Sequence, residues 1–215
     1  MELLSMYEIK KNPQPNSLTT YKYDPNASYN NLTADVKTNL KESLLDEQGH
    51  LCAYCMGSIK VDAMRIEHWA SQTNNPNLEL DYSNMLACCQ GNQGQDPSFY
   101  ICDKRKADSD LKYNPSNLRH FILTRLYYDG QGQIKSLEVD FDKQLNNVLN
   151  LNDTRLIKNR QSARRIVNER LNRNSGTRKK STIKTLIQNL KERNDKYSFT
   201  PYYGYLIYHL ENKIR

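Results

Sequence analysis

The sequence predicts an α+β protein that is mostly helical and is organised around residues 52–106. Three observations support this prediction. Apolar residues recur every three or four positions in several segments, as on one face of an amphipathic helix. In residues 121–137, two apolar runs flank a Gly-rich turn, as in a β-hairpin. Four cysteines in two groups enclose the central region with the spacing of a zinc site.

Length and composition indicate a globular protein. The 215 residues are enough for one ordinary domain, or for a small domain with helical extensions. Apolar residues make up 37% and charged residues 26%, which favours a soluble chain with no membrane span. The first residues lack the basic and then apolar pattern of a secretory signal. Five cysteines in such a chain favour a cytoplasmic protein with metal ligands over one with disulfides.

Residues 1–49 are predicted to form an extended arm and a helix. The arm, residues 1–29, is rich in Asn, Pro, Tyr and Ser and is not expected to be helical. An amphipathic helix is predicted over residues 33–48, with Thr33 as a candidate N-cap and Gly49 after its end. Its apolar face repeats every four positions, at Leu32, Val36, Leu40 and Leu44.

Residues 50–110 are predicted to form a core of short elements. Two short strands are expected, one turning through the CAYC motif at Cys52 and one centred on residues 64–69. A short helix is expected from about residue 81 to residue 89. The segment 90–101 is rich in Gly and Gln and is predicted to be a loop insertion, followed by one helical turn.

Residues 111–215 are predicted to contain a hairpin, helices and a basic segment. The hairpin turns at Asp129-Gly130-Gln131-Gly132. Helices are expected over 141–149, 153–171 and 182–193, with a Tyr-rich segment after Pro201. Its tyrosines can stack on bases, although aromatic residues at this spacing more often form a core or a partner interface: Tyr202, Tyr203, Tyr205 and Tyr208. No phosphate-binding GxxxxGK[ST] loop is present, so the chain is not itself a P-loop ATPase.

Positive charge is concentrated in residues 155–184. The whole chain carries a net charge of +7, whereas this segment holds eleven Lys or Arg and one acidic residue, a net charge of +10. Such a field attracts polyphosphates and indicates a nucleic-acid surface, whereas the alternative is a solvated helix face. Arg164 and Arg165 are candidate phosphate contacts in this segment. Arg105 and Lys106 are further candidates, with the same alternative.

Four of the five cysteines have the spacing of a structural zinc site. Cys52 and Cys55 form a CxxC pair whose turn can present two thiolates to one metal, and Cys102 offers a third. The fourth is Cys88 or Cys89. Four sulfurs in a tetrahedron leave no position for water, as in structural zinc. A redox pair or unrelated buried thiols are the alternatives.

Glu67 and His68 lie between the two cysteine groups. Neighbouring side chains on a strand point to opposite faces, but twist near a strand end can bring both towards one cleft. A lone His is more often structural than catalytic. The position of His68 between the cysteine groups, with Asn84 and Asp103 following, favours a catalytic role.

These residues resemble an HNH endonuclease of the ββα-metal class. Asn84 is followed five positions later by Cys89, as in the family pattern, which makes Cys89 a zinc ligand and Cys88 the spare cysteine. The sequence departs from the pattern in the twelve residues between Cys89 and Cys102. It departs again in Asp103, where His or Asn is usual. Asp is a hard oxygen ligand that suits Mg²⁺ or Mn²⁺.

The resemblance implies a one-metal mechanism. His68 would be the general base that activates water, and Asn84 would fix the loop that carries His68. Glu67 and Asp103 would hold the catalytic Mg²⁺ or Mn²⁺ beside the scissile phosphate. Phosphodiester hydrolysis needs such a base and a cation against the developing charge.

Longer segments extend the resemblance. The segments YEIKKNPQP and LLDEQGHLCAYC are similar to the HNH subunit of Septu-type anti-phage defence systems (PtuB-like), and related nucleases act as effectors in some retrons. The similarity covers residues 6–160 and is specific over residues 48–106. It implies an ABC-type ATPase partner (PtuA-like) and, in retron systems, a reverse transcriptase with its RNA–DNA product.

The sequence therefore predicts a metal-dependent HNH endonuclease that acts on nucleic acid, in the first place DNA, as a defence effector. Two alternatives stay open. One is an effector with the same site that cleaves RNA such as tRNA. The other is a zinc-ribbon module that binds nucleic acid and does not use its histidine and carboxylates.

Overall fold

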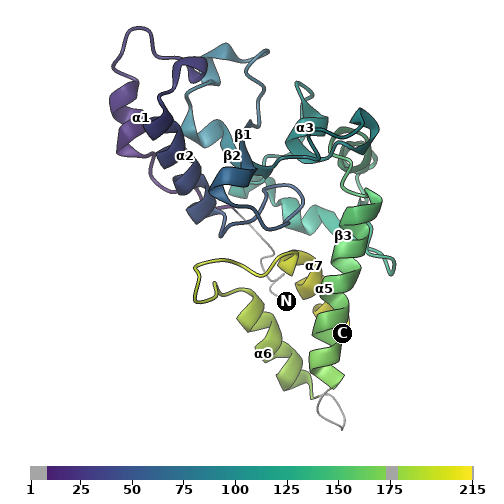
Figure 1. Ribbon diagram of the computed structural model, residues 1–215. Coiled ribbons are helices and arrows are strands. Elements are labelled where there is room, and N and C mark those ends of the chain that lie inside the picture. The colour runs from purple at the N-terminus through teal and green to yellow at the C-terminus, as the bar shows by residue number, and fades with distance from the viewer. Residues whose placement is uncertain (1–8, 173–178, 215) are drawn as a thin grey trace.

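The computed structural model describes residues 9–172 and 179–214, and it confirms the α+β class. About half of the described residues are helical, and the strands form two small antiparallel sheets. Figure 1 shows α1 and α2 side by side next to the first sheet, while the C-terminal helices α5, α6 and α7 extend away from it. None of the helices in these two ranges is long and apolar enough to cross a bilayer.

The helix α2 (Ala34–Glu47) agrees with the prediction to within one residue at each end. Its N-terminus is capped by Thr33, whose side chain accepts a hydrogen bond from the Val36 N–H. Its C-terminus is followed by Gly49 at a φ of +56°, where a residue without Cβ is favoured.

A second, shorter helix corrects the prediction of a non-helical arm. The helix α1 (Asn16–Tyr21) begins after Pro15, whose φ of −55° is already that of a helix. Leu18 is fully buried, and α1 packs against α2. Burial of one apolar side chain on a neighbouring helix thus stabilises a turn that composition alone did not indicate. Residues 1–8 of the arm lie outside the described residues.

The strands β1 (Met64–His68) and β2 (Met85–Cys89) pair antiparallel, with Ile66 opposite Ala87. The prediction of a helix ending near Cys89 is therefore wrong. That segment makes one 3₁₀ turn (Tyr82–Asn84) and then extends. Its first four strand residues are all buried, and a run with no polar face gains more from pairing with β1 than from an isolated short helix.

The other strand predicted around the CAYC motif is also shorter than expected. It is reduced to a single bridge between Leu51 and Ser58. The intervening turn is closed by hydrogen bonds from Cys52 N–H to the Gly57 carbonyl (2.9 Å) and from Met56 N–H to the Cys52 carbonyl (3.0 Å). Met56 lies at a φ of +59°, so the chain reverses too tightly for a ladder to continue.

The side chain of Gln48 completes the outer edge of β2. Its Oε1 accepts from the Ala87 N–H (2.8 Å), and its Nε2 donates to the carbonyls of Ala87 and Leu51 (2.8 Å each). Gln48 is fully buried. One amide group therefore satisfies backbone groups of β2 that a third strand would otherwise pair with.

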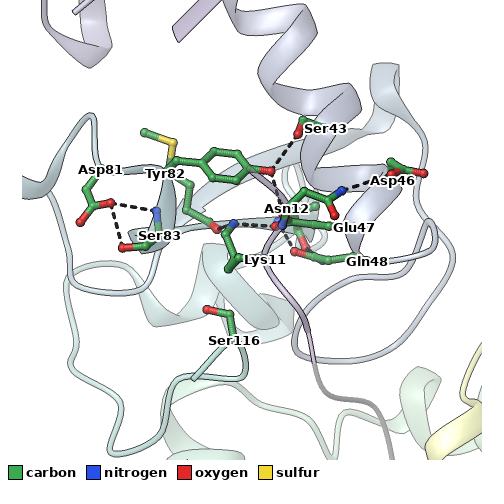
Figure 2. A network of polar contacts seen from close by, with 12 residues as sticks. Lys11, Asn12, Ser43, Asp46, Glu47, Gln48, Asp81, Tyr82, Ser83 and Ser116 are labelled. Carbon is green, nitrogen blue, oxygen red and sulfur yellow. Dashed lines mark hydrogen bonds and ion pairs between the residues drawn. The ribbon is translucent and has the colours of Figure 1, made fainter. Parts of the chain in front are cut away.

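The adjacent Glu47 fixes the N-terminal arm to the same place. Figure 2 shows its carboxylate between Lys11 and Tyr82. Lys11 Nζ lies 2.5 Å from Glu47 Oε1, and the Tyr82 hydroxyl donates to Oε2 (2.7 Å). Lys11 also donates to the Met85 carbonyl at the start of β2 (2.8 Å). The arm, α2 and β2 thus share one buried ion pair.

The remaining elements follow the predicted order. The hairpin is confirmed but is short, with Tyr128 opposite Ile134 and Gly132 in the turn at a φ of +82°. A π-helical turn (Gln144–Val148) continues the first of the later helices. The bounds are α3 (Cys102–Lys106), β3 (Leu126–Tyr128), β4 (Ile134–Ser136), α4 (Val139–Lys143), α5 (Thr154–Asn172), α6 (Lys180–Leu190) and α7 (Tyr203–Glu211).

The Tyr-rich segment after Pro201 is part of the core. It forms α7, which packs against both α5 and α6. Tyr203 and Tyr205 are buried, and the Tyr205 ring lies 5.0 Å from that of Tyr128 on β3. The rings of Tyr203 and Tyr205 are therefore unavailable for base stacking.

Replacement of Gln48 by leucine tests the edge that it completes. Gln48→Leu keeps the side-chain size but leaves one buried N–H and two buried carbonyl groups without this partner. We expect the free energy of unfolding to fall by about 2–4 kcal/mol, measured by urea denaturation. Gln188→Leu, at an exposed amide on α6, is the control and should change it by less than about 0.5 kcal/mol. Equal effects from both variants would contradict this role.

Candidate metal centre and active site

Four cysteines from three elements meet at one point. Cys52 and Cys55 lie in the turn after α2, Cys89 ends β2, and Cys102 begins α3. Their Sγ atoms all lie within 4.8 Å of one another. A zinc tetrahedron with Zn–S bonds of about 2.3 Å places its sulfurs roughly 3.8 Å apart, so this group fits a structural zinc ion.

The fifth cysteine, Cys88, stands beside this group. It is fully buried, and burial, with a further contribution from Cys52, raises the pKa of its thiol well above the usual value. Burial opposes ionisation of Cys52, but hydrogen bonds from the surrounding thiols lower its pKa well below the usual value. Spacing alone left Cys88 and Cys89 as alternatives for the fourth ligand. The four sulfurs that come together include Cys89, the choice implied by the family resemblance.

Two buried carboxylates lie next to each other beside this centre. Glu67 is on β1 and Asp103 is the second residue of α3, and packing of α3 against β2, the partner strand of β1, brings them together. Burial raises the pKa of Glu67 well above its usual value, and a hydrogen bond with Asp103 raises it further. The Tyr54 hydroxyl also donates to Glu67 (2.8 Å). Adjacent buried carboxylates of this kind attract a proton or a cation.

Each carboxylate has one basic partner. Lys106 Nζ lies 3.0 Å from Glu67 Oε1, and Arg65 forms an ion pair with Asp103. The Lys106 side chain is fully buried, whereas that of Arg65 is 37% exposed. The two carboxylates and the two basic groups balance in charge. Arg65 is the more exposed of the two basic partners.

The structure corrects the sequence interpretations of Lys106. Lys106 is only 1% exposed, and its ammonium group also donates to the His68 carbonyl (3.1 Å). It is therefore neither a surface phosphate contact nor part of a solvated face. Arg105 is exposed and donates to the carbonyls of Asn147 and Pro97.

His68 ends β1 and is held on two sides. Its Nε2 lies 2.9 Å from the Glu79 carbonyl oxygen, which can only accept, so Nε2 carries the proton and Nδ1 is the basic nitrogen. The Tyr29 ring packs edge-on against the imidazole at 4.6 Å. Burial lowers the pKa of His68 below its usual value, although the Glu79 carbonyl and the charge of Asp103 oppose this. The imidazole is thus neutral near pH 7.

Asn84 fixes the loop that follows His68. Its side chain accepts from the Ala70 N–H (2.8 Å) and donates to the carbonyls of Ala70 (3.0 Å) and Leu78 (3.3 Å). The carbonyl that accepts the hydrogen bond from the imidazole belongs to Glu79, the residue after Leu78. Asn84 therefore acts on His68 through the backbone of this loop.

Three residues of this site had no assigned role in the sequence. Arg65 could have been found, because it is two positions before Glu67 on the same strand and so shares its face. Tyr54 lies within the CAYC motif, but nothing in the motif indicates a bond to Glu67. Tyr29 lies far away in the sequence, and no local pattern links it to His68.

The basic segment 155–184 is only partly a surface. Arg160 is buried and donates to the carbonyls of Gly132 (2.6 Å) and Leu151 (2.8 Å). Arg165 is exposed, and Arg164 is half-buried. Residues 173–178 of the segment lie outside the described residues.

Comparison with known proteins finds partial similarity to nucleases of retrons. The chain is 33% identical over 86 residues to the “Retron Vc95 putative HNH endonuclease” of Vibrio cholerae serotype O1 biovar El Tor. It is 30% identical over 126 residues to the “Retron Ec83 putative HNH endonuclease” of Escherichia coli. These matches cover 38% and 50% of this chain, and only 40% and 48% of the two relatives, less than half of either. No protein-family model matches the chain.

Two single substitutions test which cysteines hold metal. We expect Cys89→Ser to lose zinc and unfold the core, because structural zinc supplies folding energy. Cys88→Ser should keep one zinc per chain, because Cys88 is outside the group of four sulfurs. Metal content by atomic absorption and unfolding by circular dichroism measure both effects. Equal zinc loss from both variants, or a folded wild-type protein without metal, would contradict the assignment.

Proposed function

We propose that this protein is a metal-dependent HNH endonuclease of the ββα-metal class, which hydrolyses phosphodiesters in nucleic acid, in the first place DNA. The observation that carries the proposal is the placement of an oriented histidine and a buried glutamate at the end of β1 and of a buried aspartate at the start of α3. The chain order β1, β2, α3 and the partial similarity to retron HNH endonucleases support it.

His68 would act as the general base. Its Nδ1 can accept a proton from water, while Nε2 remains bonded to the Glu79 carbonyl. The Asn84 bonds to the loop hold that carbonyl in position. A base with a lowered pKa is in its active, neutral form at neutral pH, which suits this role.

Glu67 and Asp103 would hold the catalytic Mg²⁺ or Mn²⁺. Their oxygen donors suit these hard cations. Such an ion, when bound, stabilises the negative charge that develops on the phosphate during hydrolysis. Asp103 would release Arg65, the more exposed of the two basic partners, when it binds the ion.

The competing function of a non-catalytic zinc module explains less of the structure. Zinc binding by the cysteine group requires neither the buried carboxylate pair nor the oriented imidazole. Burying adjacent carboxylates costs free energy, which Arg65 and Lys106 offset here, and a zinc module would need neither the carboxylates nor these partners. Perturbed ionisable groups gathered in this way are typical of catalytic sites. An RNA-cleaving enzyme would use the same site. Only the nucleic acid that is cleaved would distinguish it from a DNA-cleaving enzyme.

We divide the chain into three regions by role: an N-terminal arm and helix (1–49), a nuclease core (50–110) and a helical C-terminal region with a hairpin (111–215). These regions are not independent folding units. The first region reaches the catalytic centre, because Tyr29 contacts His68. The third region covers the core, because Met56 packs against Gly204 of α7.

The proposed setting is a retron- or Septu-type (PtuB-like) defence system. There the partner would be an ABC-type ATPase (PtuA-like), with a reverse transcriptase and its RNA–DNA product in the retron case. The retron names of the two relatives support the retron setting. We predict that this protein and the ATPase encoded beside it form one complex when coexpressed, seen as a single gel-filtration peak. Two separate peaks in the presence of ATP and Mg²⁺ would count against that partner.

Replacement of His68 tests the catalytic assignment. His68→Ala removes the proton acceptor, so cleavage of plasmid DNA or transfer RNA should slow by about 10²- to 10⁴-fold. Zinc content and nucleic-acid binding should stay as in the wild type, because neither depends on the imidazole. Initial rates by gel electrophoresis, with Mg²⁺ or Mn²⁺ present, measure the effect.

His209→Ala is the matched control, because His209 lies on α7 and bonds to Asn168 on α5. It should cleave at the wild-type rate. Mild EDTA should stop wild-type cleavage before zinc is lost, and added Mn²⁺ should restore it. A folded His68→Ala protein that cleaves at the wild-type rate, free of contaminating nuclease, would end the proposal.

A further inference from the structure

The loop between Cys89 and Cys102 forms one wall of an open cavity that the proposed mechanism does not use. The cavity has a volume of about 400 Å³, within the range of small-ligand pockets. None of its lining residues is acidic, and amide side chains dominate the wall formed by the loop: Gln90, Asn92, Gln93 and Gln95. This is the same segment whose length departs from the HNH pattern.

The loop has a defined backbone conformation that is fixed at several points. Gly91 has a φ of +62°, and a Cβ there would lie 2.4 Å from Lys104 Cβ and 2.5 Å from the Ile101 carbonyl, so only glycine fits against α3. Asn92 Nδ2 donates to the Phe99 carbonyl (2.6 Å) across the loop. The amide and aromatic side chains are therefore presented from a defined backbone.

Arginines from separate elements converge on this loop. Arg65 of β1 donates to Gln93 Oε1 (3.1 Å), and Arg155 of α5 donates to Gln95 Oε1 (2.9 Å). Arg65 is also the ion-pair partner of Asp103. The loop thus links Arg65, beside the carboxylate site, to Arg155 at the start of the basic helix α5.

The exposed chemistry of the loop matches that of an unpaired base. Gln93 and Gln95 offer amide groups, which can donate and accept along a base edge at once. Phe99 is 51% exposed, with the Arg155 guanidinium 5.9 Å from its ring centre. Exposed aromatic rings beside arginine are stacking surfaces for bases. In a duplex the base faces are already stacked, so such a surface favours unpaired nucleotides.

We propose that this loop binds an unpaired nucleotide next to the cleaved phosphate, with the base stacked on Phe99 and its edge bonded to Gln93 and Gln95. The loop would then give the enzyme a preference for single-stranded substrate and for the base at one position. The proposal rests on the proposed nuclease function, but its binding step can be measured without catalysis.

The first experiment measures binding in a His68→Ala background by fluorescence anisotropy. Phe99→Ala should weaken binding of a single-stranded oligonucleotide by roughly ten- to a hundredfold. Its salt dependence should not change, because no charge is removed. Tyr23→Ala removes another exposed ring, 83% exposed in the arm, and should bind like the parent. Unchanged single-strand binding by Phe99→Ala would overturn the proposal, as would equal losses for single strand and duplex.

The second experiment sequences the products of a randomised single-stranded library. The wild type should show a base preference beside the cut, and Gln95→Ala, which leaves the Arg65–Gln93 contact intact, should reduce it without abolishing cleavage. The double variant Gln93→Ala/Gln95→Ala should lose the base preference, whereas Gln188→Ala on α6 should keep it. A wild type that cuts without preference, or variants that keep it, would overturn base recognition. Phe99-dependent binding without any cleavage would instead refute the nuclease function and leave the binding site standing.

Discussion

The buried ammonium group of Lys106 is the charge around which the site is arranged. Its removal from water is costly unless partners replace the lost hydration, and here they are the Glu67 carboxylate and the His68 carbonyl, both on β1. This requirement ties α3 to β1 beside His68, the proposed general base. Asp103, three residues earlier in α3, is carried to the same place. The cysteine group joins the same elements from the other side, because Cys102 begins α3 and Cys89 ends β2.

The rigid surroundings of this site come from distant parts of the chain. Gln48 satisfies the outer edge of β2, and the Glu47–Lys11 pair holds the arm against the start of that strand. Once the arm is held, Tyr29 can pack on His68, and its N–H bonds to the Glu79 carboxylate. A general base needs a fixed orientation more than it needs an unusual pKa. The arm and α2 therefore help to hold the proposed active site in place, although they supply none of the proposed metal ligands.

Charge is divided between two roles in this protein. Lys106 and Arg160 are buried and serve the fold, whereas Arg65, Arg105 and Arg155 stand at the surface around the loop that follows Cys89. Net charge alone treats these residues alike. Burial distinguishes them. The surface expected to bind nucleic acid is therefore the region between the carboxylate site and α5, and not α5 alone.

The sequence by itself determined those features that depend on near neighbours. The Thr33 cap, the four-residue period of α2, the hairpin turn and the CxxC knuckle are each specified within a few residues. Only the tertiary structure decided the rest. Residues 85–89 are a strand because β1 and Gln48 supply their partners, since an apolar run of that length suits either a strand or a helix. The burial of Lys106, the pairing of Arg65 with Asp103 and the contact of Tyr29 with His68 join groups far apart in the chain. Their energies come from desolvation and charge pairing, which depend on which distant groups meet and leave no local pattern.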